Sequence, residues 1–140
     1  MRAACSALAV VMLVLALGAC GESSEEKAQN TVCDAKDDIA KQVNELKSLT
    51  AATVTTDAVT EHLNAIKNDL NDISDAQSDL SSDRRSEVET ANKEFSSSVQ
   101  GLAGEVGRSV AASDAKAQIV TALQELGASY QKAFAGVSCD

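Results

Sequence analysis

Apolar residues recur every three or four positions between residues 32 and 134, and charged residues occupy most of the intervening positions. This spacing matches the 3.6 residues per turn of an α-helix, so each run predicts an amphipathic helix with one buried face. The pattern divides into four runs, whose apolar members are Val32, Ile39, Val43, Leu46 and Leu49; Val59, Leu63, Ile66, Leu70, Ile73 and Leu80; Val88, Ala91, Phe95, Val99, Leu102 and Val106; and Ile119, Val120, Leu123, Leu126, Tyr130 and Phe134. We therefore expect an all-α fold, a four-helix up-down bundle.

Two polar stretches separate the first three runs. Residues 50–56 (TAATVTT) are rich in β-branched side chains, which lower helix propensity, and Thr56 or Asp57 can cap the following helix. Residues 81–85 (SSDRR) contain good N-cap residues, and residues 86–89 (SEVE) match a capping box. We expect a loop over the first stretch and a turn over the second. The threonine-rich loop is also a candidate for O-linked sugar in an exported protein, although a plain loop is the favoured interpretation.

Small and polar residues mark the ends of the last two runs. Gly101, Gly104 and Gly107 recur every three residues where the third run thins out. They indicate a close helix contact or a frayed helix end, with a functional hinge as the alternative. Ser113 is the expected cap of the fourth helix, and Gly136 is placed to end it.

The N-terminus has a different pattern. Residues 3–17 are apolar except for Cys5 and Ser6, and they follow the single positive charge of Arg2. A membrane-spanning helix needs about 20 apolar residues. This shorter run, which ends in small residues, predicts a cleaved signal peptide rather than a permanent span.

The segment Leu17-Gly18-Ala19-Cys20 at the end of this run resembles the lipobox of bacterial lipoproteins, and all of its positions match. The resemblance covers about the first 21 residues. It implies that residues 1–19 are removed and that the Cys20 thiol is diacylglycerylated, often with a further acyl group on the new amino terminus. Two or more acyl chains hold a protein stably on a bilayer. The alternative is an ordinary secretory signal, with Cys20 left as a free or paired thiol.

Residues 20–31 are expected to form a lipidated, flexible tether. The stretch GESSEEKAQN after Cys20 has Ala28 as its one apolar residue, and this composition is typical of a solvated linker. The predicted organisation is therefore a signal peptide over residues 1–19, the tether, and a helical bundle domain over residues 32–140, which is long enough for one small core.

The lipoprotein resemblance also bears on the other cysteines. Cys5 would leave with the signal peptide, Cys20 would carry lipid, and export would place Cys33 and Cys139 in an oxidising compartment. We therefore expect a disulfide between Cys33 and Cys139. The alternatives are two free thiols or pairing between molecules.

This disulfide helps to decide the topology. Cys33 lies at the start of the first predicted helix and Cys139 just past the last, and a disulfide needs Cα atoms within about 7 Å of each other. The start and end of an up-down bundle share a pole only when the helix count is even. The alternative is one helix over residues 57–107, about 75 Å long. We prefer four helices, because the long helix would leave apolar stripes exposed.

Composition and charge exclude one class of partner. The chain has no proline or tryptophan and few aromatic residues, a helical composition with a thin core. Removal of residues 1–19 takes away Arg2 and leaves 11 basic and 21 acidic residues, a formal charge of −10. A nucleic acid or an anionic lipid surface requires a basic patch, which the isolated pair Arg84-Arg85 does not supply. We expect no nucleic acid partner, and attachment to the membrane through lipid.

No group of residues predicts catalysis or metal binding. His62 is the only histidine, and the sequence places no second ligand or base on its helix face, so we expect a solvated or half-buried side chain. Asp72, Asp75 and Asp79 share a helix face but lack the spacing of a calcium loop, so we expect a solvated acidic face. The chain is expected to have no enzyme activity, cofactor or metal.

Two functional hypotheses follow. In the first, the chain is a lipid-anchored, extracytoplasmic helical module that contacts another protein of the cell envelope. In the second, the bundle opens to carry or sense a small apolar molecule such as a lipid, because small core residues and the glycines of the third helix would permit a cavity. Small lipoproteins of high-GC Gram-positive bacteria look similar in their acidic, alanine-rich helices, which implies an envelope location and no specific activity.

Overall fold

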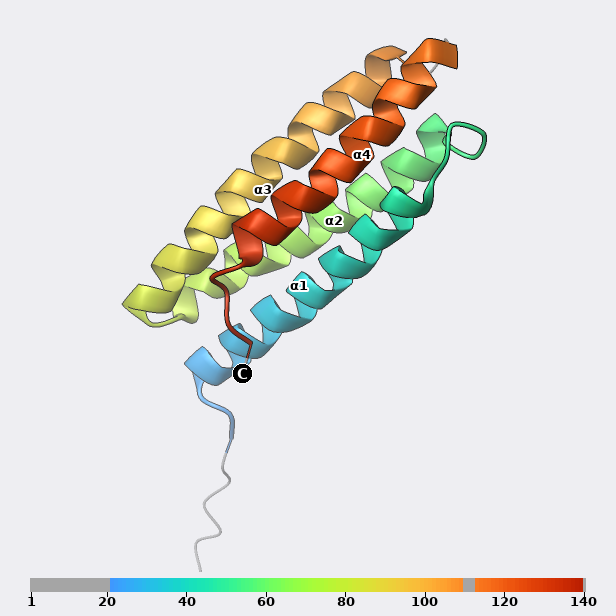
Figure 1. The fold of residues 1–140 in the computed structure, drawn as a ribbon. Coiled ribbons are helices and arrows are strands. Elements are labelled where there is room, and N and C mark those ends of the chain that lie inside the picture. Colours follow the sequence, from blue (N-terminus) through green and yellow to red (C-terminus); the bar gives the residue numbers. More distant parts are fainter. Residues whose placement is uncertain (1–20, 110–112, 140) are drawn as a thin grey trace, which may run out of the picture.

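The computed structural model describes residues 21–109 and 113–139, which form an antiparallel bundle of α-helices (Figure 1). The helices are α1 (Ser24–Ser48), α2 (Thr56–Ala76), α3 (Ser82–Ser109) and α4 (Ser113–Phe134), and a short 3-10 helix, η1 (Gln77–Asp79), follows α2. No strand occurs among the described residues. The predicted all-α, four-helix bundle is confirmed.

The four helices form a ring in which each packs against its neighbours in sequence, and α4 closes the ring against α1. Within the described residues, neither α1 and α3 nor α2 and α4 approach each other closely, so these pairs are diagonal across the core. None of the helices in this part of the chain combines the length and apolar character needed to cross a bilayer.

One continuous core lies inside the ring. Every member of the four apolar runs is buried except Leu49, Val120 and Tyr130, and these three pack against the core from its edge. The core also includes four residues outside the predicted runs: Ala28, Ala35, Val54 and Val137. The period of the apolar residues therefore predicted the buried face of each helix.

An aromatic cluster joins α3 to α4 on one side of the core. Phe95 is fully buried, and its ring meets those of Tyr130 and Phe134 edge-on, with centroid distances of 5.4 and 5.9 Å. The Tyr130 hydroxyl donates to the Lys36 carbonyl oxygen at 2.7 Å, which ties α4 to α1. Burial, followed by the charge of Asp37, raises the pKa of Tyr130 to about 12, so the hydroxyl remains a donor.

The first helix begins at Ser24, so the predicted flexible tether over residues 20–31 is wrong for residues 24–31. Of the predicted tether, only residues 21–23 are described as non-helical. Ala28, expected to be solvated, is 4% exposed and packs in the core. The first turns of α1 were therefore not predicted as helical, because their composition is polar.

Local interactions explain this early start. The Ser23 side chain accepts a hydrogen bond from the Glu26 backbone N–H at 3.1 Å, which caps the helix. Glu25 and Glu26 lie in the first turn, where the positive end of the helix dipole favours carboxylates. A short polar stretch can be helical when it is capped and places one small residue in the core.

The loop between α1 and α2 lies where the threonine-rich stretch predicted it. Its last residue, Thr55, caps α2, because its side chain accepts a hydrogen bond from the Ala58 N–H at 3.2 Å. The predicted caps, Thr56 and Asp57, are therefore wrong by one or two residues. Val54 is fully buried and closes this end of the core.

The alternative of a single helix over residues 57–107 is wrong, because the chain turns between η1 and α3. Leu80 has an extended backbone and is 4% exposed, so its side chain turns into the core at this point. The Arg85 guanidinium donates to the carbonyl oxygens of Gln77, Ser78 and Leu80 at 3.2, 2.5 and 3.2 Å. These carbonyls lie at a helix end, where intrahelical partners are missing.

Cys33 and Cys139 form the predicted disulfide, with their Cα atoms 5.6 Å apart. The bond joins α1 to the segment that follows α4 (Figure 1). The sequence indicated that Cys33 lies at the start of the first helix. Because α1 begins at Ser24, Cys33 lies instead in the third turn of the helix. The even helix count inferred from this bond is nevertheless confirmed.

The three regularly spaced glycines lie inside α3, which continues to Ser109. A Cβ atom added at Gly101 or Gly107 would meet nothing within 4 Å, so the predicted close helix contact does not hold at these two positions. Gly101 also lies well inside the helix and so does not mark a frayed end. The close approach is instead at Gly127 of α4, where a Cβ would lie 2.6 Å from Cδ of Lys47 on α1.

Candidate functional site

The lipobox-like residues Leu17, Gly18, Ala19 and Cys20 lie outside the described residues. The start of α1 nevertheless limits how far Cys20 can be from the bundle. Three residues separate it from Ser24, and an extended chain advances at most about 3.6 Å per residue, so the two Cα atoms are within about 14 Å. A group attached to Cys20 would therefore lie beside the end of the bundle where α1 begins.

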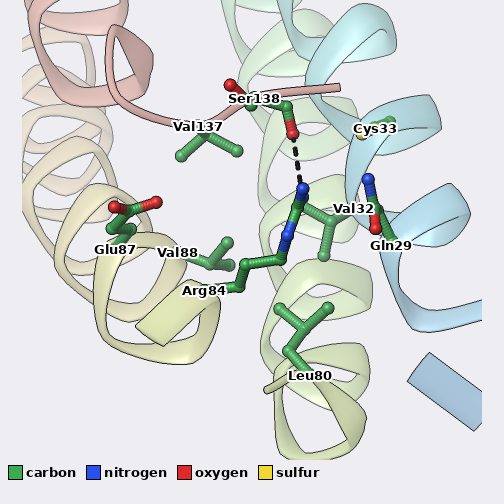
Figure 2. A pocket seen from close by; sticks show the side chains of 9 residues that line it. All are labelled: Gln29, Val32, Cys33, Leu80, Arg84, Glu87, Val88, Val137 and Ser138. Carbon is green, nitrogen blue, oxygen red and sulfur yellow. Dashed lines mark hydrogen bonds between the residues drawn. The ribbon is translucent and has the colours of Figure 1, made fainter. Parts of the chain in front are cut away.

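We call this end the disulfide pole: the first three turns of α1, η1, the first turn of α3, and the C-terminal strap of residues 135–139. The strap crosses this pole after α4 ends. Lys36 donates from Nζ to the Val137 carbonyl oxygen at 2.7 Å. Figure 2 shows a second bond, in which Arg84 donates to the Ser138 carbonyl oxygen at 3.4 Å. With the disulfide and the burial of Val137, these contacts hold the strap in place.

A small hollow lies beneath the strap (Figure 2). Val32, Leu80, Val88 and Val137 form its apolar part, and the Arg84 side chain lies across it. Its volume of about 10 Å³ is about that of a single water molecule, which is too small for an organic ligand. The disulfide pole is therefore a stabilised end of the bundle rather than a ligand pocket.

A much longer depression, the α3–α4 groove, runs between α3 and α4. It consists of three hollows of about 680, 300 and 430 Å³, in order from the disulfide pole to the opposite end. The first two share Ser98 and Ser129, and the last two share Glu105, Ala122 and Glu125. The hollows adjoin one another and open to solvent, so they form one continuous surface feature.

The groove exists because short side chains line it where the two helices meet. Gly101 leaves an open space in its wall, and the buried residues Leu102 and Leu126 form part of its floor. The hydroxyls of Ser98 and Ser129 are 2.7 Å apart and join α3 to α4 across it. A groove of this kind offers a preformed surface of mixed polarity.

The two halves of the groove differ in charge. In the half nearer the disulfide pole, charged lining residues of both signs occur: Glu89, Glu94, Lys93 and Lys132. In the other half, the charged residues among the described lining are Glu105 of α3 and Glu125 of α4, and both are exposed. Neither forms an ion pair with another described residue. This half therefore presents two uncompensated carboxylates from opposite walls.

His62 is half-buried, as predicted, with a side chain that is 23% exposed. Its partners come from α1: Nδ1 lies 2.7 Å from Gln42 Oε1 and 3.4 Å from Glu45 Oε2. The imidazole ring therefore links α2 to α1 through these polar contacts. Among the residues described, no three His, Cys, Asp or Glu side chains are grouped so as to hold a metal ion.

A group of aspartates lies on the surface shared by α1 and α2. Burial, followed by the charges of Asp38 and Asp72, raises the pKa of Asp69 from 3.8 to about 6. Asp72, Asp75 and Asp79 are exposed, as predicted for a solvated acidic face. These carboxylates are consistent with an acidic surface and define no pocket.

The α3–α4 groove is therefore the feature best suited to contact another molecule, and the sequence-predicted residues do not mark it. Cys33 and Cys139 are joined at the disulfide pole, and the groove begins beyond them on other helices. Comparisons of the chain with models of protein families, with curated proteins and with solved structures find no match.

Proposed function

We propose that this chain is a lipid-anchored, extracytoplasmic lipoprotein whose bundle is a non-catalytic interaction module of the cell envelope. The anchor would be Cys20, with Leu17, Gly18 and Ala19 as the rest of the lipobox. The disulfide supports an oxidising compartment, because such bonds persist outside the cytoplasm. The short stretch between Cys20 and Ser24 would hold the disulfide pole at the membrane surface.

The observation that carries the interaction role is the contrast between the hollows. The groove between α3 and α4 offers space on the outside of the bundle, while the hollow at the disulfide pole has room for about one water molecule. A carrier of an apolar molecule needs an apolar pocket of about 300 Å³ or more that encloses most of its ligand. An open groove of mixed polarity favours contact with a protein over enclosure of a lipid.

Intact-mass measurement of the protein extracted from membranes tests the anchor. We expect a mass that lacks residues 1–19 and includes at least two acyl chains. The Cys20→Ala variant should lack the acyl mass, while a Cys33→Ala/Cys139→Ala variant, which keeps the anchor, should retain it. An unmodified Cys20 in membrane-extracted protein would contradict the lipoprotein proposal.

Proximity crosslinking in intact cells tests the interaction role. A reproducible protein neighbour is expected for the wild-type chain and not for the Cys20→Ala variant. Native mass spectrometry of the same preparation provides the test against the carrier role. A stoichiometric apolar molecule that is bound in addition to the acyl anchor would favour the carrier instead.

A further inference from the structure

We infer that the α3–α4 groove is the docking surface of this module and that it receives a cationic, amphipathic helix of a partner protein. This inference rests on the proposed interaction role and adds the surface and the chemistry of the partner. It is argued from the length of the groove, the spacing of the residues that line it, and the carboxylates on its walls.

The dimensions of the groove fit a helix. On α4 its lining residues extend from Ala115 to Lys132, which corresponds to about 26 Å along the helix axis. This length accommodates a partner helix of about 17 residues. The groove follows α3 over a similar distance, from Glu89 to Glu105, so a fifth helix could contact both walls over most of its length.

The lining residues on α4 repeat every seven positions, which is the spacing that a packed partner helix requires. Ala115, Ala122 and Ser129 form a row of small residues, and Gln118, Glu125 and Lys132 form a parallel polar row. Small residues allow a helix to approach closely, and flanking polar residues set its register and its choice of partner. The small residues are partly buried, and Ala122 packs against the edge of the core, whereas the residues of the polar row are exposed beside them.

The charge of the groove walls indicates which kind of partner helix would bind. Glu105 and Glu125 face the same half of the groove from opposite walls, and no lysine or arginine is among the described residues that line that half. Carboxylates from both walls would attract a partner that carries lysine or arginine on either side of its apolar seam. A second copy of this chain is a poor occupant, because the chain has a formal charge of −9 and two acidic grooves would repel each other.

Binding of a synthetic helix to the full chain, solubilised in mild detergent, tests the inference. The probe is a 17-residue peptide with alanine and leucine in its seam and lysines at flanking heptad positions, and its affinity is measured by fluorescence anisotropy at 0.15 M salt. A peptide with glutamate in place of lysine serves as the charge control. We expect saturable binding of the lysine peptide and no binding of the glutamate peptide.

Charge-reversal variants locate the site. Glu105→Lys/Glu125→Lys should weaken binding of the lysine peptide about tenfold, because two favourable contacts become repulsive. The matched control, Glu61→Lys/Asp75→Lys, changes the net charge equally at exposed positions of α2 and should change the affinity less than about twofold. Equal weakening by both variants would overturn the inference, because binding would then reflect net charge alone.

Filling the groove provides a test that does not depend on charge. Gly101→Leu places a side chain in the open space of the groove wall, and Gly107→Leu places one on the same helix outside the lining residues. The first should abolish most of the binding and the second should not. Binding that persists in Gly101→Leu, or a dimer that Glu105→Lys/Glu125→Lys dissociates, would contradict a partner helix in this groove. The intact mass that tests acylation of Cys20 does not depend on peptide binding. Failure of this inference and failure of the lipoprotein proposal are therefore distinguishable.

Discussion

Removing the Cys33–Cys139 disulfide should lower the free energy of unfolding by several kcal/mol and leave the folded bundle intact. The bond joins residues 106 positions apart. In the chain-entropy description, closing a loop of about 100 residues restricts the unfolded chain enough to stabilise the folded state by about 4.7 kcal/mol at 25 °C. This is a large share of the 5–15 kcal/mol that is typical of a whole domain, roughly a third or more.

The bundle should remain folded because the strap and the core have other contacts. Val137 is buried, and its carbonyl oxygen accepts from Lys36. The helices pack through a core that lies mostly away from the bond. We therefore expect the far-ultraviolet circular dichroism of the variant to match that of the wild-type protein at 25 °C.

Urea unfolding of Cys33→Ala/Cys139→Ala, followed at 222 nm, measures the effect. Alanine removes the sulfur without adding a hydroxyl to a half-buried position of α1. We expect the free energy of unfolding to fall by about 3–5 kcal/mol and the melting temperature to fall by about 12–20 °C. Wild-type protein in excess dithiothreitol should show the same shift.

The chain-entropy reasoning would be refuted by a double variant that folds normally and loses less than about 1 kcal/mol. Such a result would mean that the strap separates freely from the pole, so that the bond restrains only a segment that is already detached. Iodoacetamide labelling of the wild-type protein without denaturant provides a direct control. No label should be incorporated at either cysteine, because both sulfurs are bonded.

The remaining predictions concern α3 and the acidic surface. Gly101→Ala should raise the free energy of urea unfolding by about 0.5–1 kcal/mol, because alanine favours the helix and its Cβ meets no neighbour; destabilisation would show that the position needs glycine. Phe95→Ala should lower the same quantity by about 3–5 kcal/mol, because it empties a fully buried site, and an effect below 1 kcal/mol would argue against the aromatic cluster. The folded pKa of Asp69 is raised, so between pH 4 and pH 6 the folded chain retains a proton that the unfolded chain has released. The stability of the wild-type chain relative to Asp69→Asn should therefore fall as the pH rises through this range, and a constant difference would contradict the raised pKa.

The sequence was a good guide to the helices because their apolar period is regular. It identified nearly all of the core. Serine and aspartate at residues 81–85 also indicated a break between the second and third helices without any glycine or proline, but the predicted turn is too long: the chain turns at Leu80 and Ser81, and residues 82–85 already belong to α3. The sequence failed at the start of α1, where one buried alanine among polar residues carries no periodic signal. Capping by Ser23 and the acidic first turn were visible in the sequence and could have been given more weight.

The groove was missed for a different reason. Its lining residues are small or polar, and a sequence pattern assigns such residues simply to the solvent side of a helix. Whether two solvent-facing rows form a groove depends on which helices are neighbours and how closely they pack. Gly101 was noticed but was interpreted as part of a close helix contact or a frayed end, and the position that approaches another helix, Gly127, has no periodic partners to mark it.

The bond between Cys33 and Cys139 also makes the polypeptide between them a closed covalent ring. One exposed loop of that ring, residues 50–53, is at the far end from the bond. A protease that nicked the chain there would release no fragment, since the two pieces would remain attached through sulfur and through the intact helices. Damage at a single loop would thus leave one molecule with its groove still assembled, a useful property for a protein whose proposed location exposes it to secreted proteases.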